Sequence, residues 1–452
     1  MPVRLLKDTL QSMFVQIDYE KLPRNFQDAI YITRNLGGQY LWIDSLCIIQ
    51  DSDEDWQHEA ALMGEVYLNG QCNLSAVNSK DSSVGMIYER EPTEVFALGF
   101  ASGNEKQEIY LCDPRIWFNQ IVDGPLLKRG WVCQERLLSS GNLHFGKTMV
   151  FWECGSQTAC ETFPNGLPLQ LEKFANEPLV KRKAAKLIRS SSGLASSSLE
   201  DTSHQLQLWN QVLELYTRCQ LSFGTDKLIA VAGLAAIAHH NFSKNYLAGL
   251  WEEYLPFQLL WDLIGNPIRS PPPSYRAPTW SWAAVDAGIL CHKTCSACTS
   301  LIEVIDAHVE LVGTSPYGQV KSGYIEIKCS LNTARMTQHE WLRPTFSEKS
   351  ALPSWDYEPS AEDKEDIFYL VPVCGGTYSM PEDSAQRHAL NGLILTESDN
   401  RKGCFVRRGV FFMDDEDPGD LLESCRRFAK AYIDSDLKSA GDGSGEFVIT
   451  IL

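Results

Sequence analysis

Two acidic side chains, Asp44 and Glu59, stand where a carboxylate could do chemistry. Asp44 interrupts the nearly apolar stretch YLWIDSLCII at residues 40–49, and Glu59 follows in a run with helical spacing. Such an apolar stretch is typical of a central parallel strand, and open α/β sheets bind ligands at the carboxyl ends of their strands. A carboxylate half-buried there can act as a base or as an electrostatic stabiliser. We therefore take Glu59 and Asp44 as candidate catalytic residues.

Both carboxylates also have a structural interpretation. Glu59 would then pair with Arg129, with Arg136 or with a backbone amide, because ion-pair networks also place charged residues in unusual environments. Asp44 would pair with an arginine or accept hydrogen bonds from tryptophan N–H groups, since a buried charge without a partner is costly. The catalytic interpretation requires that Asp44 and Glu59 reach one shared hollow that solvent can enter.

A second polar cluster surrounds Trp131 in the segment RGWVCQERLLS at residues 129–139. Arg129 could hold a carboxylate or a phosphate through two parallel hydrogen bonds. We therefore expect Arg129, Trp131, Gln134 and Glu135 to contribute to substrate binding. The structural alternative is that this segment, with Arg136, clamps one secondary-structure element onto the next.

Trp280 and Trp282 alternate with small residues in the segment APTWSWAAVD at residues 277–286. Alternating aromatic residues most often fill a core between layers. They can also line an apolar pocket, here together with Trp152 and His144, because small-molecule sites combine such rings with a few polar groups. Trp280 and Trp282 are therefore further candidate substrate-binding residues, with core packing as the alternative.

The fourteen cysteines are scattered along the chain rather than packed into a short framework. In a reducing compartment, cysteines of this kind are mostly buried free thiols. Cys133 with His144 could form a thiolate nucleophile, although free cysteine is usually inert core and the sequence does not fix the distance between them.

One cluster has residue types that bind metals: Cys291, His292, Cys295 and Cys298. Close cysteine spacing suits tetrahedral zinc, but the paired halves of a zinc motif are missing. These side chains converge poorly without a donor from elsewhere in the chain. We therefore expect a loop without metal here.

The charge of the chain restricts its partners. Forty basic and 58 acidic residues give a formal net charge of −18. A surface this acidic repels phosphate backbones and anionic lipid headgroups, so we expect no nucleic-acid partner and no membrane. No apolar run reaches the length of about 18 residues that spans a bilayer, and the N-terminus resembles no targeting peptide. We expect a cytoplasmic protein with no certain cofactor.

The elements around the candidate residues alternate between helix and strand. Helical spacing runs from Phe26 to Leu36, with a natural stop at Gly37. After the expected strand at 40–49, Ser52 opens a second helix in a sequence that resembles a capping box with Asp55. A further strand is expected near residues 72–77. Strand, helix and strand with short links predict a right-handed parallel crossover.

Four regions follow from these patterns. An α/β domain is expected over residues 1–175, with further strands at 108–112 and within 143–154. The serine tracts predict a flexible linker or loop over residues 176–205. A helical region follows over 206–290, and strand-like alternation predicts a β-rich C-terminal region over 291–452.

Three stretches together resemble the fungal heterokaryon-incompatibility (HET) domain family. The first runs from LPRNFQDAI at residues 22–30 through the stretch at 40–51, the second is 129–139, and the third is 277–286. Their order and spacing match over residues 20–290. HET domains usually begin with a tyrosine-containing strand that ends in a Leu-Ser-x-x-Trp-Gly-like segment. Nothing before Leu22 matches it, so we expect that this first strand is missing.

The resemblance implies an α/β fold with a parallel-sheet core, remotely similar to Toll/interleukin-1 receptor (TIR) domains, and a role in non-self recognition and programmed cell death. Some TIR domains cleave NAD with a glutamate on the helix after a central strand. The resemblance therefore implies NAD as a candidate substrate and Glu59 as the carboxylate that stabilises an oxocarbenium-like ribosyl centre.

Two alternatives to this function stay open. The chain could be a HET scaffold recruited as an enzyme or binding protein for a small hydrophobic metabolite in secondary metabolism. It could also be a non-catalytic interaction module whose ligand is a protein partner or a second copy of the chain. The acidic surface and the missing first strand favour this last alternative.

Overall fold

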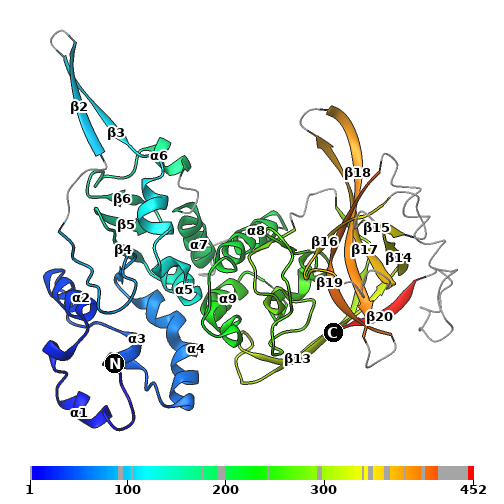
Figure 1. The fold of residues 1–452 in the computed structure, drawn as a ribbon, viewed down its shortest axis with the longest axis horizontal. Coiled ribbons are helices and arrows are strands. Elements are labelled where there is room, and N and C mark those ends of the chain that lie inside the picture. The colour runs from blue at the N-terminus through cyan, green and yellow to red at the C-terminus, as the bar shows by residue number, and fades with distance from the viewer. Residues whose placement is uncertain are drawn as a thin grey trace. The chain divides into compact units, whose positions relative to one another are not determined.

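The computed structural model divides the chain into two compact units (Figure 1). Unit 1 comprises Met1–Val212, Cys219–Ser222 and Ile229–Asn241, and unit 2 comprises Leu213–Arg218, Phe223–Leu228 and Phe242–Leu452. The structure describes residues 3–89, 95–102, 105–174, 178–190, 199–242, 244–292, 298–337, 341–344, 350–360, 367–380, 383–398, 403–415 and 446–452. One boundary between the units falls within a long helix, Leu199–Tyr216, and the division predicted at residues 175, 205 and 290 stays a prediction.

Unit 1 mixes helices and strands. Its helices are α1 (Leu10–Val15), α2 (Arg24–Asn35), α3 (Asp44–Cys47), α4 (Asp53–Asn69), α5 (Gly130–Leu138), α6 (Leu169–Phe174), α7 (Pro178–Ser190), most of α8 (Leu199–Tyr216) and α9 (Ala232–His239). Shorter helical turns are η1 (Tyr19–Lys21), η2 (Phe118–Val122), η3 (Leu126–Lys128) and η5 (Ile229–Val231). Residues 3–21 thus contain helical turns and no strand.

The strands of unit 1 form a small mixed sheet and a hairpin. Within the described residues, the sheet has the order β1-β4-β5-β6, with β1 (Asn73–Ser75), β4 (Gly141–Phe145), β5 (Val150–Cys154) and β6 (Thr158–Cys160). The β1–β4 pair is parallel, and the β4–β5 and β5–β6 pairs are antiparallel. The hairpin joins β2 (Val95–Ser102) to β3 (Glu105–Cys112). This arrangement does not confirm a TIR-like parallel core.

The prediction of a central strand at residues 40–49 is wrong. Residues 40–43 are irregular, and the helix α3 follows them. The N–H of Cys47 donates to the carbonyl of Ile43, and the Asp44 carboxylate accepts from the N–H of Ser45 at 2.7 Å. A short apolar run does not by itself distinguish strand from helix, and an Asp-Ser pair supplies a local acceptor that competes with a sheet. The predicted strand–helix–strand crossover is therefore not formed.

Other local predictions for unit 1 are confirmed. The helices α2 and α4 lie where helical spacing places them, and β1 and β5 lie within the expected strand segments. β4 begins two residues ahead of its expected segment. Ser52 is the N-cap of α4, and its hydroxyl accepts from the N–H of Asp55 at 3.5 Å. The Asp55 carboxylate accepts from the N–H of Ile49 at 2.7 Å. This bond ties the start of α4 to the segment that follows α3.

A buried ion pair joins α5 to the sheet. Arg136 donates to both carboxylate oxygens of Glu153 at 2.8 Å, and the two side chains are 4% and 0% exposed. His144 of β4 bonds the same carboxylate at 3.2 Å. Burial raises the pKa of Glu153, but the Arg136 charge and hydrogen bonds outweigh it and hold that pKa well below its usual range. The structural alternative for the 129–139 segment, a clamp between elements, therefore applies to Arg136.

Lys181 of α7 holds the C-terminal end of α5. Its Nζ donates to the backbone carbonyls of Arg136 at 2.7 Å and Leu137 at 3.0 Å, and to that of Ser139. These carbonyls have no partner within the helix itself, because the last turn of any helix leaves them unpaired. Lys181 thereby fixes the end of α5 from a neighbouring helix.

The segment 176–205, predicted as a serine-rich linker or loop, is largely helical where it is described. It contains α7 and the start of α8. Lys181, Ala184 and Leu187 are buried at helical spacing on α7, which gives this segment an inner face. Residues 191–198, which hold most of the serines, lie outside the described residues.

Unit 2 is rich in strands, as predicted for the C-terminal region. Its described part contains a ten-stranded sheet with the order β12-β13-β20-β19-β18-β17-β14-β15, to which β11 adds at β17 and β16 at β19. The strands are β11 (Thr299–Ser300), β12 (Glu303–Leu311), β13 (Val320–Cys329), β14 (Asn332–Met336), β15 (Leu342–Pro344), β16 (Leu352–Trp355), β17 (Phe368–Met380), β18 (Asp383–Glu397), β19 (Cys404–Asp415) and β20 (Phe447–Ile451).

Shorter elements precede this sheet in unit 2. They are η4 (Gly224–Asp226), β7 (Tyr246–Leu247), β8 (Leu250–Trp251), η6 (Glu252–Tyr254), α10 (Leu255–Gln258), β9 (Asp262–Leu263), η7 (Trp282–Ala284) and β10 (Ile289–Leu290). Arg407 of β19 pairs with Asp356 at 2.9 Å and lies 3.4 Å from the centre of the Trp261 ring. Over the whole described chain, no helix combines the length and the hydropathy that a membrane span needs.

Replacing Glu153 by alanine should leave the Arg136 charge buried without its partner. We expect the free energy of unfolding of unit 1 to fall by about 3–5 kcal/mol, the usual cost of removing one side of a buried pair. Asp123→Asn, which removes one side of the exposed pair with Lys128, should cost less than about 1 kcal/mol. Urea unfolding of the full chain measures both variants. Equal small losses would contradict the clamp.

Candidate functional site

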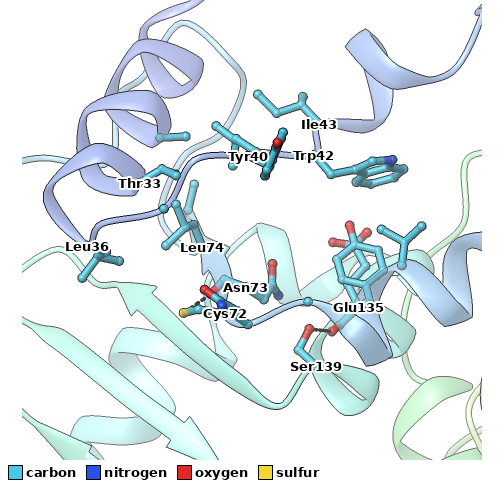
Figure 2. A pocket seen from close by; sticks show the side chains of 18 of the residues that line it. Thr33, Leu36, Tyr40, Trp42, Ile43, Cys72, Asn73, Leu74, Glu135 and Ser139 are labelled. Atoms are coloured by element: carbon cyan, nitrogen blue, oxygen red, sulfur yellow. Dashed lines mark hydrogen bonds between the residues drawn. The ribbon is translucent and has the colours of Figure 1, made fainter.

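A pocket of about 810 Å³ opens in unit 1 (Figure 2). Its volume lies in the range of small-molecule sites, about 300–1,000 Å³. The walls come from α2, the irregular stretch that leads into α3, the C-terminal end of α4, β1 and α5. In Figure 2, Tyr40, Trp42 and Ile43 lie across the pocket from Cys72 and Glu135. The stretch that was expected to form a strand thus forms one wall of the pocket.

Buried contacts of α2 fix another wall. Asp28 is 3% exposed, and its carboxylate accepts from the backbone N–H of Met86 at 2.8 Å. Ala29 and Ile32 of the same helix pack in one cluster with Met86 and Phe145 of β4. This packing joins α2 to the sheet and so fixes the position of the pocket wall that α2 forms.

Four ionisable side chains gather at one end of the pocket. Asp44 begins α3, Tyr67 lies in the last turn of α4, Arg129 precedes α5, and Glu135 lies within α5; all four line the pocket. The Tyr67 hydroxyl donates a hydrogen bond to the Glu135 carboxylate, and the charges of Asp44 and Arg129 both act on Glu135. Asp44 and Arg129 are exposed, whereas Tyr67 and Glu135 are half-buried. Solvent or a ligand can therefore reach this cluster.

Glu135 has the pKa of a group that can exchange a proton near neutral pH. Burial raises its pKa, the charge of Asp44 raises it further, and the Arg129 charge and the Tyr67 hydrogen bond oppose them, which leaves the pKa at about 7. Burial also raises the pKa of Tyr67, so its hydroxyl keeps the proton that it donates. A carboxyl group with a pKa near the working pH is suited to general acid or base catalysis.

Comparison with known families identifies the segment that carries this cluster. Residues 4–135 match the sequence model of the family described as heterokaryon incompatibility protein (HET). Residues 4–135 are a HET domain. The match covers Asp44, Tyr67, Arg129 and Glu135, and starts ahead of residue 20, where the resemblance was expected to begin. The third stretch of that resemblance, 277–286, lies outside it. Searches of curated proteins and of solved structures found no match.

The HET domain places the two expected catalytic carboxylates differently. Asp44 lines the pocket, whereas Glu59 is half-buried on α4 and is not part of the pocket lining. Burial raises the pKa of the Cys47 thiol, and the charges of Asp44 and Glu59 add to this rise, so both carboxylates lie near α3. The structure does not bring Glu59 into a shared hollow with Asp44, because the strand that was to deliver both is not formed.

Arg129 and Glu135 line the pocket as predicted for binding residues, but Trp131 and Gln134 do not. The Trp131 ring packs edge-on against Trp56, with ring centres 6.3 Å apart. Gln134 is buried, and its side-chain oxygen accepts from the N–H of Gly233 at 2.7 Å. These contacts join α5 to α4 and α9 and match the structural alternative of a clamp, and substrate binding by Trp131 and Gln134 stays a prediction.

The substrate-binding roles predicted for Trp280 and Trp282 are also not supported. Both side chains are completely buried in unit 2. The Trp282 N–H donates to the carbonyl of Gly249 at 2.9 Å, and the Trp280 carbonyl accepts from the Trp261 N–H at 2.9 Å. Complete burial of these rings matches the alternative of core packing, because no side-chain surface is left for a ligand.

The predicted Cys133–His144 nucleophile is not assembled. His144 Nε2 is bonded to Glu153, and its Nδ1 has no hydrogen-bond partner in the described part of the chain. Burial lowers the pKa of His144, so this side chain favours the neutral form. Cys133 is buried in α5. Since Nε2 is bonded to Glu153 and Nδ1 has no hydrogen-bond partner among the described residues, His144 forms no hydrogen bond with the Cys133 thiol that could activate it.

Tyr67 is a site residue that the sequence did not reveal. Its spacing with Trp56, Ala60 and Met63 on α4 identifies it as one more apolar position on a helix. The hydroxyl becomes functional only because α5, which is distant in sequence, brings Glu135 beside it. The available signal was that a buried tyrosine hydroxyl usually has a partner, without any indication of which partner.

The raised pKa of Glu135 makes the stability of the HET domain depend on pH. The folded chain holds a proton on Glu135 up to about pH 7, whereas the ordinary value is 4.5. The stabilising contribution is therefore complete below pH 4.5 and is lost as pH rises through 7. Wild type loses this contribution between pH 5 and pH 8, and Glu135→Gln does not. The free energy of unfolding of Glu135→Gln, measured relative to wild type, should therefore be higher at pH 8 than at pH 5 by on the order of 3 kcal/mol.

Urea unfolding of both proteins at pH 5 and pH 8 measures this difference. Glu65→Gln, at an exposed position on α4, is the matched control and should show no such gain. If the difference in free energy of unfolding between Glu135→Gln and wild type is the same at both pH values, the pKa of Glu135 is not raised in the folded chain.

Proposed function

We propose that this chain is a heterokaryon-incompatibility protein whose HET-domain pocket binds a dinucleotide of the NAD type and hydrolyses its nicotinamide–ribose bond. The observation that carries the proposal is the meeting of Asp44, Glu135 and Arg129 at one end of an open pocket, with the pKa of Glu135 at about 7. Two carboxyl groups of different exposure beside a guanidinium match the demands of glycosidic-bond cleavage on an anionic substrate.

The pocket offers complementary groups for such a substrate. Arg129 is exposed at the pocket and presents N–H groups that can bind a pyrophosphate through parallel hydrogen bonds. The Trp42 ring packs edge-on against Tyr67 with ring centres 5.6 Å apart, and this contact fixes its orientation beside the carboxylates. Trp42 and Tyr40 are suited to stack on a nicotinamide or adenine ring. The pyrophosphate would thus bind at Arg129, and the nicotinamide or adenine ring would bind on the wall that Tyr40 and Trp42 form.

The proposed reaction uses the two carboxyl groups in different roles. As the bond breaks, nicotinamide leaves as a neutral ring, and the ribosyl carbon becomes oxocarbenium-like. The Asp44 carboxylate stabilises this positive charge. A water molecule adds its oxygen to the ribosyl carbon and gives one proton to Glu135 in its ionised form. The products are nicotinamide, ADP-ribose and one proton, and the Tyr67 hydroxyl orients Glu135 throughout.

Nicotinamide release from NAD by the purified full chain tests the proposal. Asp44→Asn and Glu135→Gln should each lower kcat by about 100-fold or more, the usual effect of losing a general acid–base or charge-stabilising group. Glu59→Gln is the matched variant on a carboxylate outside the pocket, and it should leave the rate unchanged. Chromatography of the products measures all three variants.

A different pattern of activity among these variants would contradict the roles proposed for Asp44 and Glu135. Loss of release in Glu59→Gln with full release in Glu135→Gln would move the reaction to the sequence-based candidate. No release by the wild-type chain would reject the enzymatic proposal, and calorimetry with NAD would then show whether the pocket only binds.

The pH dependence of the reaction should report Glu135. Water activation needs its ionised form, so kcat/KM should rise with pH and level off above about 7. The Asp44 charge helps to raise this pKa, so the residual activity of Asp44→Asn should reach its plateau at lower pH. A rate that falls with pH, or a plateau that stays in place in Asp44→Asn, would contradict the role of Glu135 as base.

A binding function without hydrolysis is the second candidate. Leu36, Leu74 and Ile43 line the same pocket and give it an apolar wall that suits a small hydrophobic ligand. A ligand of this kind would use the rings and aliphatic side chains and would leave Asp44 and Arg129 at the rim. Binding of an apolar fluorescent probe that NAD fails to displace would favour this candidate over the dinucleotide.

A further inference from the structure

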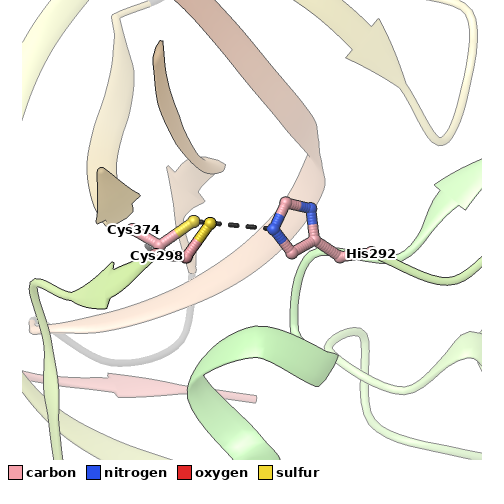
Figure 3. Close-up of side chains that lie close together, drawn as sticks. All are labelled: His292, Cys298 and Cys374. Carbon is pink, nitrogen blue, oxygen red and sulfur yellow. Dashed lines mark hydrogen bonds between the residues drawn. The ribbon is translucent and has the colours of Figure 1, made fainter. Parts of the chain in front are cut away.

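Unit 2 contains a cluster of metal-binding side chains that the proposed function does not use. His292, Cys298 and Cys374 place one potential ligand atom each within 4.8 Å of one another. The Cys374 sulfur lies 3.7 Å from His292 Nε2. Figure 3 shows the imidazole nitrogen directed at the two sulfur atoms. The sequence predicted a loop without metal here because no donor from elsewhere was visible, and Cys374 is such a donor.

Backbone pairing explains why these side chains meet. Cys298 directly precedes β11, which pairs antiparallel with β17 so that Ser300 lies opposite Cys374. The N–H of Leu301 extends this pairing by donating to the carbonyl of Val373 at 2.8 Å. Cys298 is therefore held beside the strand that carries Cys374.

The histidine is held from the other side. His292 follows β10, which pairs antiparallel with β9 through Ile289 and Leu263. The N–H of the adjacent Cys291 donates to a carboxylate oxygen of Glu214 at 3.1 Å. Three donor atoms are thus positioned by separate backbone contacts, which is a stronger observation than close spacing in the sequence.

We infer that the reduced chain binds a zinc-type cation through His292 Nε2, Cys298 Sγ and Cys374 Sγ. Zinc bonds of about 2.3 Å to sulfur and 2.0–2.1 Å to nitrogen place neighbouring ligand atoms of a tetrahedron roughly 3.5–3.8 Å apart. The 3.7 Å between Cys374 and His292 matches that edge. The three donors fill three positions of a tetrahedral site, and the set of two thiolates and one imidazole is one that zinc prefers.

Redox state controls whether this site can form. Cys298 is disulfide-bonded in the structure, whereas Cys374 is a free thiol. A dithiol or phosphine reductant supplies two electrons, and two protons complete the conversion of the disulfide into two thiols. The cation then displaces the protons of Cys298 and Cys374 as it binds, and His292 binds as neutral imidazole. The Asn391 side chain hydrogen-bonds Cys374 and would orient its sulfur in the bound state.

The experiment uses the full chain, reduced with a phosphine, incubated with zinc and then desalted. Mass spectrometry of the metal content should find one zinc per chain, and Co²⁺ in its place should give the thiolate charge-transfer bands and strong visible bands of tetrahedral coordination. Cys374→Ser and His292→Ala should each lower zinc affinity at least about ten-fold, in competition with a chromophoric chelator. Cys404→Ser, on a free and half-buried cysteine of β19, is the matched control and should bind as wild type does.

Two results would overturn the inference. One is a reduced wild-type chain that retains no zinc, and the other is an unchanged affinity in both Cys374→Ser and His292→Ala. Circular dichroism of the metal-free variants shows whether each is folded; if Cys374→Ser is not, His292→Ala decides the outcome. The chain that has not been reduced should bind zinc more weakly than the reduced chain, and equal affinity would contradict the role of Cys298.

Discussion

The buried pair of Arg136 and Glu153 sets the position of α5, and the pocket depends on that position. Arg136 is directed into the sheet, where it pairs with Glu153, and His144 bonds the same carboxylate. Glu135 is its neighbour in the helix and therefore points to a different side, which is the side of the pocket. Burying an ion pair adds little net stability, because desolvation offsets the attraction. Its contribution here is orientation, since one fixed side chain determines where the next one points.

The raised pKa of Glu135 results first from burial and then from charges that different parts of the chain carry. Asp44 and Arg129 oppose each other in their effect on it, and both are exposed. Asp44 comes from α3, whose neighbourhood is held by the N-terminal segment: Leu5 donates to the carbonyl of Ser45 and accepts from the N–H of Gln50. A ligand that neutralised Arg129 would leave Asp44 unopposed and raise the pKa of Glu135 further. In the proposed function, binding of an anionic ligand would thereby be coupled to proton transfer at Glu135.

The sequence predicted what local patterns determine. Periodicity located α2 and α4. It did not distinguish helix from strand at 40–49, because an apolar run of that length fits both. Arg129 and Glu135 were named from one recognisable segment, and both line the pocket. The sequence does not show which side of α5 each side chain takes, so it did not separate Glu135 from Gln134, which is buried against Gly233. Tyr67 and Cys374 were not singled out because their partners are distant in sequence. Trp280 and Trp282 had two interpretations in the sequence because core and pocket use the same rings.

The packing of α5 has a consequence for how this domain can be divided. The HET match ends at Glu135, within a helix that continues to Leu138 and is held there by β5 and α7. Gly64 and Gly233 allow α4 and α9 to approach so closely that a methyl group on Gly64 would lie 2.8 Å from the Gly233 Cα. A fragment cut at the family boundary would expose the apolar face of α4 and leave the final turn of α5 without its supports. The packing of residues 4–135 therefore depends on the rest of unit 1, including the discontinuous segment that supplies α9.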